Sequence, residues 1–110
     1  MLELVKLELE GAGFAVQTAS LPAAALSFYE EHWRKIKVVV SDFKMPGMNG
    51  EALFGHLQRI NPQVRAILMT GFYGDRVAAP LFAKGLHRCI EKPFHLEELV
   101  EGVRDAMAAA

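Results

Sequence analysis

The sequence predicts an α/β fold in which a mostly parallel sheet is covered by helices on both faces. Helical and strand-like patterns alternate along the chain, beginning and ending with a helix. Two strand-like runs, 36–41 and 66–69, are mostly apolar without alternation, which is typical of strands buried on both faces of a parallel sheet. A single domain over residues 1–110 suits this length, and 52% hydrophobic residues can form its core.

The first elements are a helix, a short strand and a second helix. Leu2–Glu10 has apolar residues at helical spacing, and Gly11 follows its end. Phe14–Val16 is predicted to be a short strand. We expect Ser20 to cap the next helix, with Pro22 in the first turn, where proline is tolerated.

The rest of the chain repeats this alternation three times. The strand at 36–41 leads directly to Asp42. A turn that contains glycines and Asn49 covers 43–50, and a helix then extends to residue 60. After the strand at 66–69, Asp75 is predicted to cap a helix that contains Pro80 and ends at Gly85. A weaker strand at 87–91 and a helix at 95–107 complete the pattern.

Composition excludes several classes of protein. The formal net charge of −1 comes from mixed acids and bases, so we expect no direct nucleic-acid binding. No apolar run is long enough to span a membrane, and the first ten residues do not resemble a secretory signal. The single cysteine, Cys89, cannot form an internal disulfide, which fits a cytoplasmic protein. The four histidines (His32, His56, His87 and His95) share no metal-ligand spacing.

Three polar residues, Asp42, Thr70 and Lys92, each follow an apolar strand directly. Because the carboxyl ends of parallel strands meet at one edge of the sheet, these side chains should lie close together. Taken singly, each has an ordinary explanation: Asp42 as a turn residue, Thr70 as a structural residue and Lys92 as a solvated residue. Together a carboxylate, a hydroxyl and an ammonium can accept, hydrogen-bond and neutralise a phosphoryl group, with Asp42 as the nucleophile.

Three segments resemble the receiver domains of two-component response regulators. Val38–Gly50 is similar to their phosphoacceptor strand and following loop, Ile67–Gly71 to their fourth strand, and Glu91–Phe94 to the lysine–proline turn after their fifth. The resemblance extends from residue 2 to about 107. It implies a flavodoxin-like fold and a non-enzymatic signalling module in which Asp42 accepts a phosphoryl group from a histidine kinase or phosphotransfer protein.

The resemblance also implies roles for single residues. The Asp42 carboxylate and the backbone carbonyl of Lys44 would be Mg²⁺ ligands. Thr70 and Lys92 would bind the phosphoryl group, and Thr70 and Cys89 would occupy the switch positions. The peptide bond before Pro93 would be cis.

The chain departs from the family pattern at Lys44, two residues after Asp42, and in two further places. The family opens with an apolar strand that ends in two acidic residues, whereas this sequence begins in the first helix. We therefore expect an incomplete, weak Mg²⁺ site, and exposed strand edges that favour a homodimer, a domain swap or a rearranged sheet. A misplaced start codon or a trimmed chain is the simpler explanation. At the second switch position Cys89 replaces the usual aromatic ring, and a small buried hydrophobe is the expected role.

Two alternatives compete with a phosphorylated receiver. A pseudo-receiver would keep the fold and Asp42 but would not be phosphorylated efficiently, and the absent acidic pair favours it. An unrelated small α/β enzyme is disfavoured because the sequence has no G-x-S-x-G elbow, P-loop or G-x-G-x-x-G fingerprint. Partners are expected on the face built from 77–84, 87–91 and 96–104. The sequence names neither the cognate kinase nor an output domain.

Overall fold

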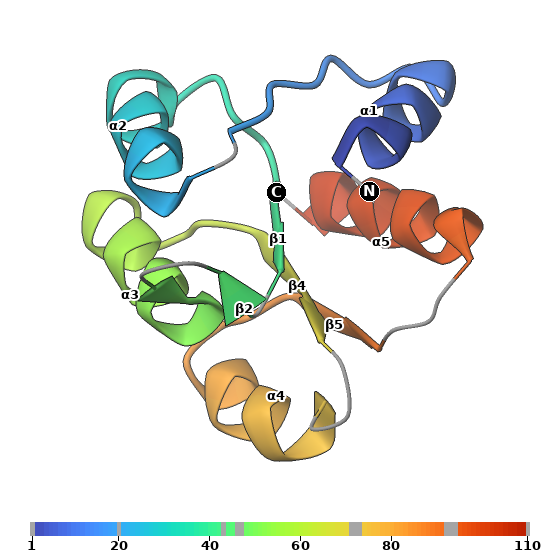
Figure 1. The fold of residues 1–110 in the computed structure, drawn as a ribbon. Helices are drawn as coiled ribbons and strands as arrows, with labels where there is room; N and C mark the ends of the chain where they lie inside the picture. The colour runs from blue at the N-terminus through green and yellow to red at the C-terminus, as the bar shows by residue number, and fades with distance from the viewer. Residues whose placement is uncertain are drawn as a thin grey trace.

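A computed structural model describes residues 2–19, 21–42, 44–45, 48–70, 74–91 and 95–109. Helices and strands alternate along them as expected (Figure 1). The helices are α1 (Leu2–Gly11), α2 (Pro22–His32), α3 (Gly50–Ile60), α4 (Gly74–Ala83) and α5 (Leu96–Ala109). The strands are β1 (Val39–Asp42), β2 (Lys44–Met45), β3 (Met48–Asn49), β4 (Ala66–Thr70) and β5 (Arg88–Glu91).

The main sheet is parallel and has the strand order β1-β4-β5. The central strand β4 is buried at all five positions, which confirms the interpretation of its unbroken apolar run. By contrast, all four residues of β1 are only half-buried. Among the described residues β1 pairs with β4 and with no second strand.

Helices cover both faces of this sheet, as predicted (Figure 1). On one face Ile67 packs against α1 and α5 in a cluster of buried residues (Leu9, Ile67, Ile90, Leu99, Val100 and Val103). On the other face Leu68 packs against α2, α3 and α4 in a second cluster (Tyr29, Leu53, Phe54, Leu57, Val64, Ala66, Leu68, Leu81 and Leu86). Successive β4 residues therefore alternate between two cores, as the period of a strand requires.

Tyr29 shows how the second cluster is closed by α2. Its side chain is 3% exposed, and its hydroxyl oxygen accepts a hydrogen bond of 3.2 Å from Nδ2 of Asn61, just after α3. Burial raises the pKa of the Tyr29 hydroxyl above its ordinary value of 10.0, and the hydrogen bond from Asn61 acts against that rise. The contact ties α2 to the end of α3.

The predicted strand at Phe14–Val16 is wrong, because this segment belongs to no strand. Phe14 and Val16 still pack against the α1–α5 side of the core, but among the described residues the segment pairs with no strand. The next strand also begins later than predicted, at Val39. The backbone N–H of Ile36 is still bonded to the carbonyl of Trp33 in the turn after α2.

Two helix starts also differ from the prediction. Leu21, not Ser20, is the N-cap of α2; it has the extended conformation favoured before a proline, and Pro22 takes the first helical position. Ser20 itself lies outside the described residues. Helix α4 begins at Gly74, so Asp75 belongs to the first turn rather than the cap. Pro80 lies within α4, and Gly85 after its end has the expected positive φ of 111°.

Candidate functional site

The carboxyl ends of β1 and β4 bring two of the predicted site residues side by side. Asp42, the last residue of β1, is the register partner of Met69, and Thr70 follows Met69 directly at the end of β4. Because the strands are parallel, both side chains emerge at the same edge of the sheet. Glu91 at the end of β5 pairs with Thr70. Lys92 and Pro93, which follow Glu91 in sequence, lie outside the described residues.

Thr70 is the one polar residue among the fully buried side chains of the described chain, with 3% of its surface exposed. Its Oγ1 lies 3.6 Å from Sγ of Cys89 on β5, a contact in which either atom can be the donor. A thiol is a weak hydrogen-bonding group, so this contact satisfies the hydroxyl without holding it strongly. Cys89 is half-buried and packs against the cluster under α2, α3 and α4, which fits its expected role as a small core residue.

Asp42 is half-buried at the rim of the sheet. The hydroxyl of the preceding Ser41 donates to the backbone carbonyl of Asp42 at 2.9 Å. Directly after Asp42, β2 and β3 form a two-stranded antiparallel hairpin, with Lys44 opposite Asn49. Sequence patterns did not predict this hairpin, because two-residue strands are too short to show a period.

Asn49 connects the hairpin to α3 by capping the helix. Its side-chain oxygen accepts a hydrogen bond of 2.8 Å from the backbone N–H of Ala52. The sequence predicts Asn49 only as part of the turn, although an Asn before an apolar helical run is also a typical N-cap signal. The cap therefore fixes where α3 starts relative to the loop that carries Lys44.

The residues at this edge offer few ligands for a metal ion. No group of three or more His, Cys, Asp or Glu side chains is placed to hold a metal within the described part of the chain. The candidate ligands are the Asp42 carboxylate and the Lys44 backbone carbonyl. Two oxygen ligands fit a Mg²⁺ ion that keeps most of its water, since Mg²⁺ is often bound through one or two carboxylates.

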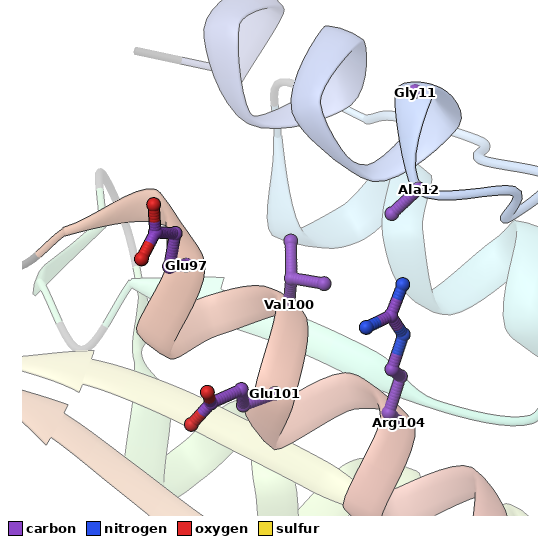
Figure 2. Close-up of a pocket in the computed structure, with 6 residues that line it drawn as sticks. All are labelled: Gly11, Ala12, Glu97, Val100, Glu101 and Arg104. Carbon is purple, nitrogen blue, oxygen red and sulfur yellow. The ribbon is translucent and has the colours of Figure 1, made fainter.

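A surface cavity of about 420 Å³ lies elsewhere, between the end of α1 and α5 (Figure 2). It is lined by Gly11, Ala12, Glu97, Val100, Glu101 and Arg104. Val100 forms an apolar floor, with carboxylates on one side and the Arg104 guanidinium near Ala12 (Figure 2). None of the predicted site residues lines this cavity, so it is separate from the strand-end site.

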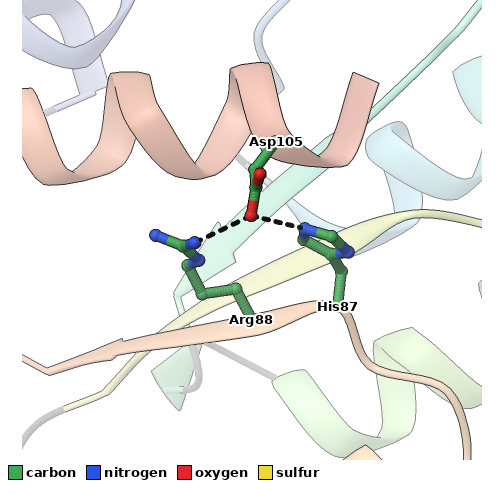
Figure 3. A network of polar contacts seen from close by, with 3 residues as sticks. All are labelled: His87, Arg88 and Asp105. Atoms are coloured by element: carbon green, nitrogen blue, oxygen red, sulfur yellow. Dashed lines mark hydrogen bonds and ion pairs between the residues drawn. The ribbon is translucent and has the colours of Figure 1, made fainter. Parts of the chain in front are cut away.

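A polar network joins β5 to α5 at the other end of the strand. Arg88 donates from Nη2 to Oδ2 of Asp105 at 3.0 Å, and Nε2 of His87 lies 3.9 Å from the same oxygen (Figure 3). The 17-residue separation of Arg88 and Asp105 gives no local sequence signal. Because Asp105 is largely exposed, the ion pairs contribute little to stability.

No helix in the described part of the chain is both long and apolar enough to cross a membrane.

Comparison with known proteins places these features in a family. A model of the response regulator receiver domain matches residues 1–104. The chain is 36% identical over 98 residues to the C4-dicarboxylate transport transcriptional regulatory protein DctD of Rhizobium meliloti, covering 89% of this chain and 21% of that protein. It is 31% identical over 99 residues to the sensor kinase CckA of Brucella abortus, covering 90% and 10% respectively. The chain thus spans no more than about a quarter of these curated relatives' lengths.

Solved structures agree with this match. A response regulator receiver domain protein from Clostridium thermocellum has a TM-score of 0.93 and 28% identity, covering 98% of this chain and 86% of the other. The receiver domain of NtrX from Brucella abortus has a TM-score of 0.88 at 24% identity, covering 98% and 90%, and shows the same fold. The flavodoxin-like receiver fold predicted from the sequence is therefore confirmed.

Proposed function

Because the chain belongs to the response regulator receiver domain family, we propose that it is a phosphoacceptor module of a two-component phosphorelay. Receiver domains are signalling modules and are generally not enzymes. The observation that supports the proposal is the register of β1 and β4, in which Asp42 and Thr70 are the last residues of two neighbouring parallel strands. The partner would be a histidine kinase or a phosphotransfer protein carrying a phosphohistidine, and the site of action the cytoplasm.

The chemistry follows from the groups at that edge. A carboxylate oxygen of Asp42 attacks the phosphorus, the new O–P bond forms as the N–P bond of the phosphohistidine breaks, and the electron pair returns to the imidazole nitrogen. The Thr70 hydroxyl then donates to a phosphoryl oxygen. We propose that Lys92 supplies the positive charge that neutralises the phosphoryl group, and that the peptide bond between Lys92 and Pro93 is cis.

Receiver domains generally bind Mg²⁺ at the phosphorylation site. Here we propose that Asp42 and the backbone carbonyl of Lys44 hold the ion weakly, with water at the remaining positions. Bound Mg²⁺ supplies positive charge for the phosphoryl oxygens. A weak site means that phosphorylation should require more Mg²⁺ than a site with several carboxylates would.

The switch is proposed to operate through Thr70 and Cys89. Without a phosphoryl group the Thr70 hydroxyl contacts the thiol at 3.6 Å. When the phosphoryl oxygens arrive, the hydroxyl exchanges the thiol for a charge-assisted hydrogen bond, and Cys89 on β5 loses its contact with Thr70 on β4. The exchange would transmit the state of Asp42 to the side of the sheet that α4 covers.

The edge of β1 that pairs with no strand among the described residues supports a proposal about assembly. Val39 donates its N–H to the carbonyl of Arg65, so in this parallel ladder the N–H and C=O of Val40 point away from β4. Such an edge accepts an extended segment of another chain, in a homodimer or a domain swap. Val40→Pro would remove the edge-facing donor while leaving the β4 ladder intact, and it should abolish any assembly formed in this way.

A pseudo-receiver is the second candidate function, favoured by the small metal-ligand set at the sheet edge. One experiment separates the two. The protein is incubated with Mg²⁺ and acetyl phosphate and its intact mass is recorded, with Asp42→Asn as the control. A phosphoryl adduct that the variant lacks supports a working receiver. A folded protein that gains no adduct at high Mg²⁺ contradicts phosphoryl transfer and leaves the pseudo-receiver.

A further inference from the structure

Helix α2 carries exposed apolar residues outside its core-facing side. One side faces the core, where Pro22 and Tyr29 are buried and Leu26 is partly buried. Another side carries Leu21, which is 56% exposed, Ala24, and Phe28, which is 36% exposed. These three residues, here called the outer stripe, recur at helical spacing. A helix that is hydrophobic all round is normally buried, so the outer stripe is unusual for a surface helix.

The outer stripe is accessible in the fold. Figure 1 places α2 at the periphery, away from α1, α4 and α5. The Phe28 ring packs against the imidazole of His32, with 4.4 Å between the ring centroids. This contact orients the Phe28 ring along the helix surface.

The carboxylates of α2 oppose its dipole, although the last turn also contains His32, whose Nε2 lies 3.8 Å from Oε2 of Glu31. The first turn has no acidic residue, and the N-cap Leu21 makes no side-chain hydrogen bond to the free backbone N–H groups. Two carboxylates, Glu30 and Glu31, instead lie in the last turn, at the negative end of the helix. Each arrangement is unfavourable for an isolated helix, since the N-terminal end attracts negative charge.

An antiparallel copy of the same helix resolves both features. In a two-fold pair of outer stripes, the large Phe28 side chain of each copy meets the small Ala24 of the other. Small side chains at such a crossing let two helix axes approach closely. The same register brings the exposed Glu31 carboxylate, at one end, next to the N-terminus of the other copy at Leu21, where the described first turn has no acidic residue. The helix is thus complementary to itself in both shape and charge.

We propose that the outer stripe of α2 is an interface with a second copy of this chain. The helix is about 16 Å long, so the contact is small and the dimer should dissociate on dilution, with a dissociation constant on the order of 10–100 µM. This interface depends neither on phosphorylation of Asp42 nor on the edge of β1.

Sedimentation equilibrium of the whole chain over a wide concentration range tests the proposal. We expect a concentration-dependent dimer for the unmodified protein. Phe28→Glu should leave a monomer, since it places a carboxylate at the centre of the contact. Glu31→Lys should raise the dissociation constant about tenfold, since each dimer then brings two cations to two positive helix ends.

Glu30→Lys is the matched control. Glu30 is adjacent to Glu31 in sequence and changes the net charge equally, but it lies about 160° around the helix from Phe28. It should leave the dissociation constant unchanged. Circular dichroism checks that each variant keeps its helix content.

Two results would overturn the interface. The first is an unmodified protein that stays monomeric at millimolar concentration. The second is a dimer that responds equally to Glu30→Lys and Glu31→Lys, or that persists in Phe28→Glu but is lost in Val40→Pro. The last pattern would assign the dimer to the edge of β1.

Discussion

Replacing Thr70 by valine should separate its structural role from its proposed role in phosphoryl binding. The side chain is 97% buried, and its hydroxyl contacts the Cys89 thiol at 3.6 Å. A typical hydrogen bond contributes about 1 kcal/mol, and one to a thiol contributes less. Valine restores about 0.8 kcal/mol by burying one more apolar carbon and keeps the β-branched shape that suits a strand. The free energy of unfolding should therefore change by less than about 1 kcal/mol.

Phosphorylation should respond very differently to the same change. If the Thr70 hydroxyl donates to a phosphoryl oxygen in the transition state, its removal should slow adduct formation about 10- to 100-fold, somewhat less than the loss of an oxyanion-hole donor. Urea unfolding gives the stability, and the time course of intact mass with acetyl phosphate gives the rate.

Thr70→Ser gives the opposite pattern and is the matched control. It keeps the hydroxyl but removes a buried methyl group, so it should cost about 1 kcal/mol of stability and leave the rate within a few fold. A loss of more than about 2 kcal/mol in Thr70→Val would contradict a weak contact between the hydroxyl and the thiol. Phosphorylation of folded Thr70→Val at the rate of the unmodified protein would contradict a role of the hydroxyl in binding the phosphoryl group.

Three further predictions concern stability, and urea unfolding measures each. Asn49→Ala should lose about 1 kcal/mol by uncapping α3; an unchanged stability would contradict the cap. Gly55→Ala should raise the free energy of unfolding by about 0.5–1 kcal/mol, because no atom lies within 4 Å of the new Cβ. Gly102→Ala should raise it less, since its Cβ would lie 3.2 Å from Cδ of Arg88. Equal gains in the two variants would refute this prediction. Burial raises the pKa of Tyr29 above its ordinary value of 10.0, so its stabilising contribution is complete below about pH 10 and falls above it; Tyr29→Phe should weaken the loss of stability above about pH 10.

The sequence predicted the elements whose apolar pattern is long and is matched by neighbours in the fold. The run at 66–69 was identified correctly because β4 is paired on both sides and covered by helices on both faces. Phe14–Val16 has a similar local composition but pairs with no strand among the described residues, and it forms none. Strand formation depends on partners that are distant in sequence, and a local pattern does not contain that information.

In the candidate site too, some features could be predicted from the sequence and others depend on strand pairing. Asp42 and Thr70 could be predicted to lie at one edge of the sheet, because the carboxyl ends of neighbouring parallel strands meet there. The contact between Thr70 and Cys89 could not, since it depends on the register of β4 with β5. The β2–β3 hairpin after Asp42 was missed because neither strand is long enough to show a period. The assignments of Lys92 and Pro93 remain predictions, as those residues lie outside the described part.

The thiol at position 89 has a consequence for the energy of switching. A hydroxyl bonded to a strong acceptor in the resting state would have to give up about 1 kcal/mol or more before binding a phosphoryl oxygen. Thr70 gives up only a weak contact with sulfur and gains a hydrogen bond to a charged group, which contributes about 1.5–3 kcal/mol. Cys89→Ser would supply the stronger acceptor. It should therefore hold Thr70 in the resting position and shorten the lifetime of the phosphorylated state, whereas Cys89→Ala should preserve or lengthen it. Equal lifetimes in the two variants would show that the contact between these strands does not bias the switch.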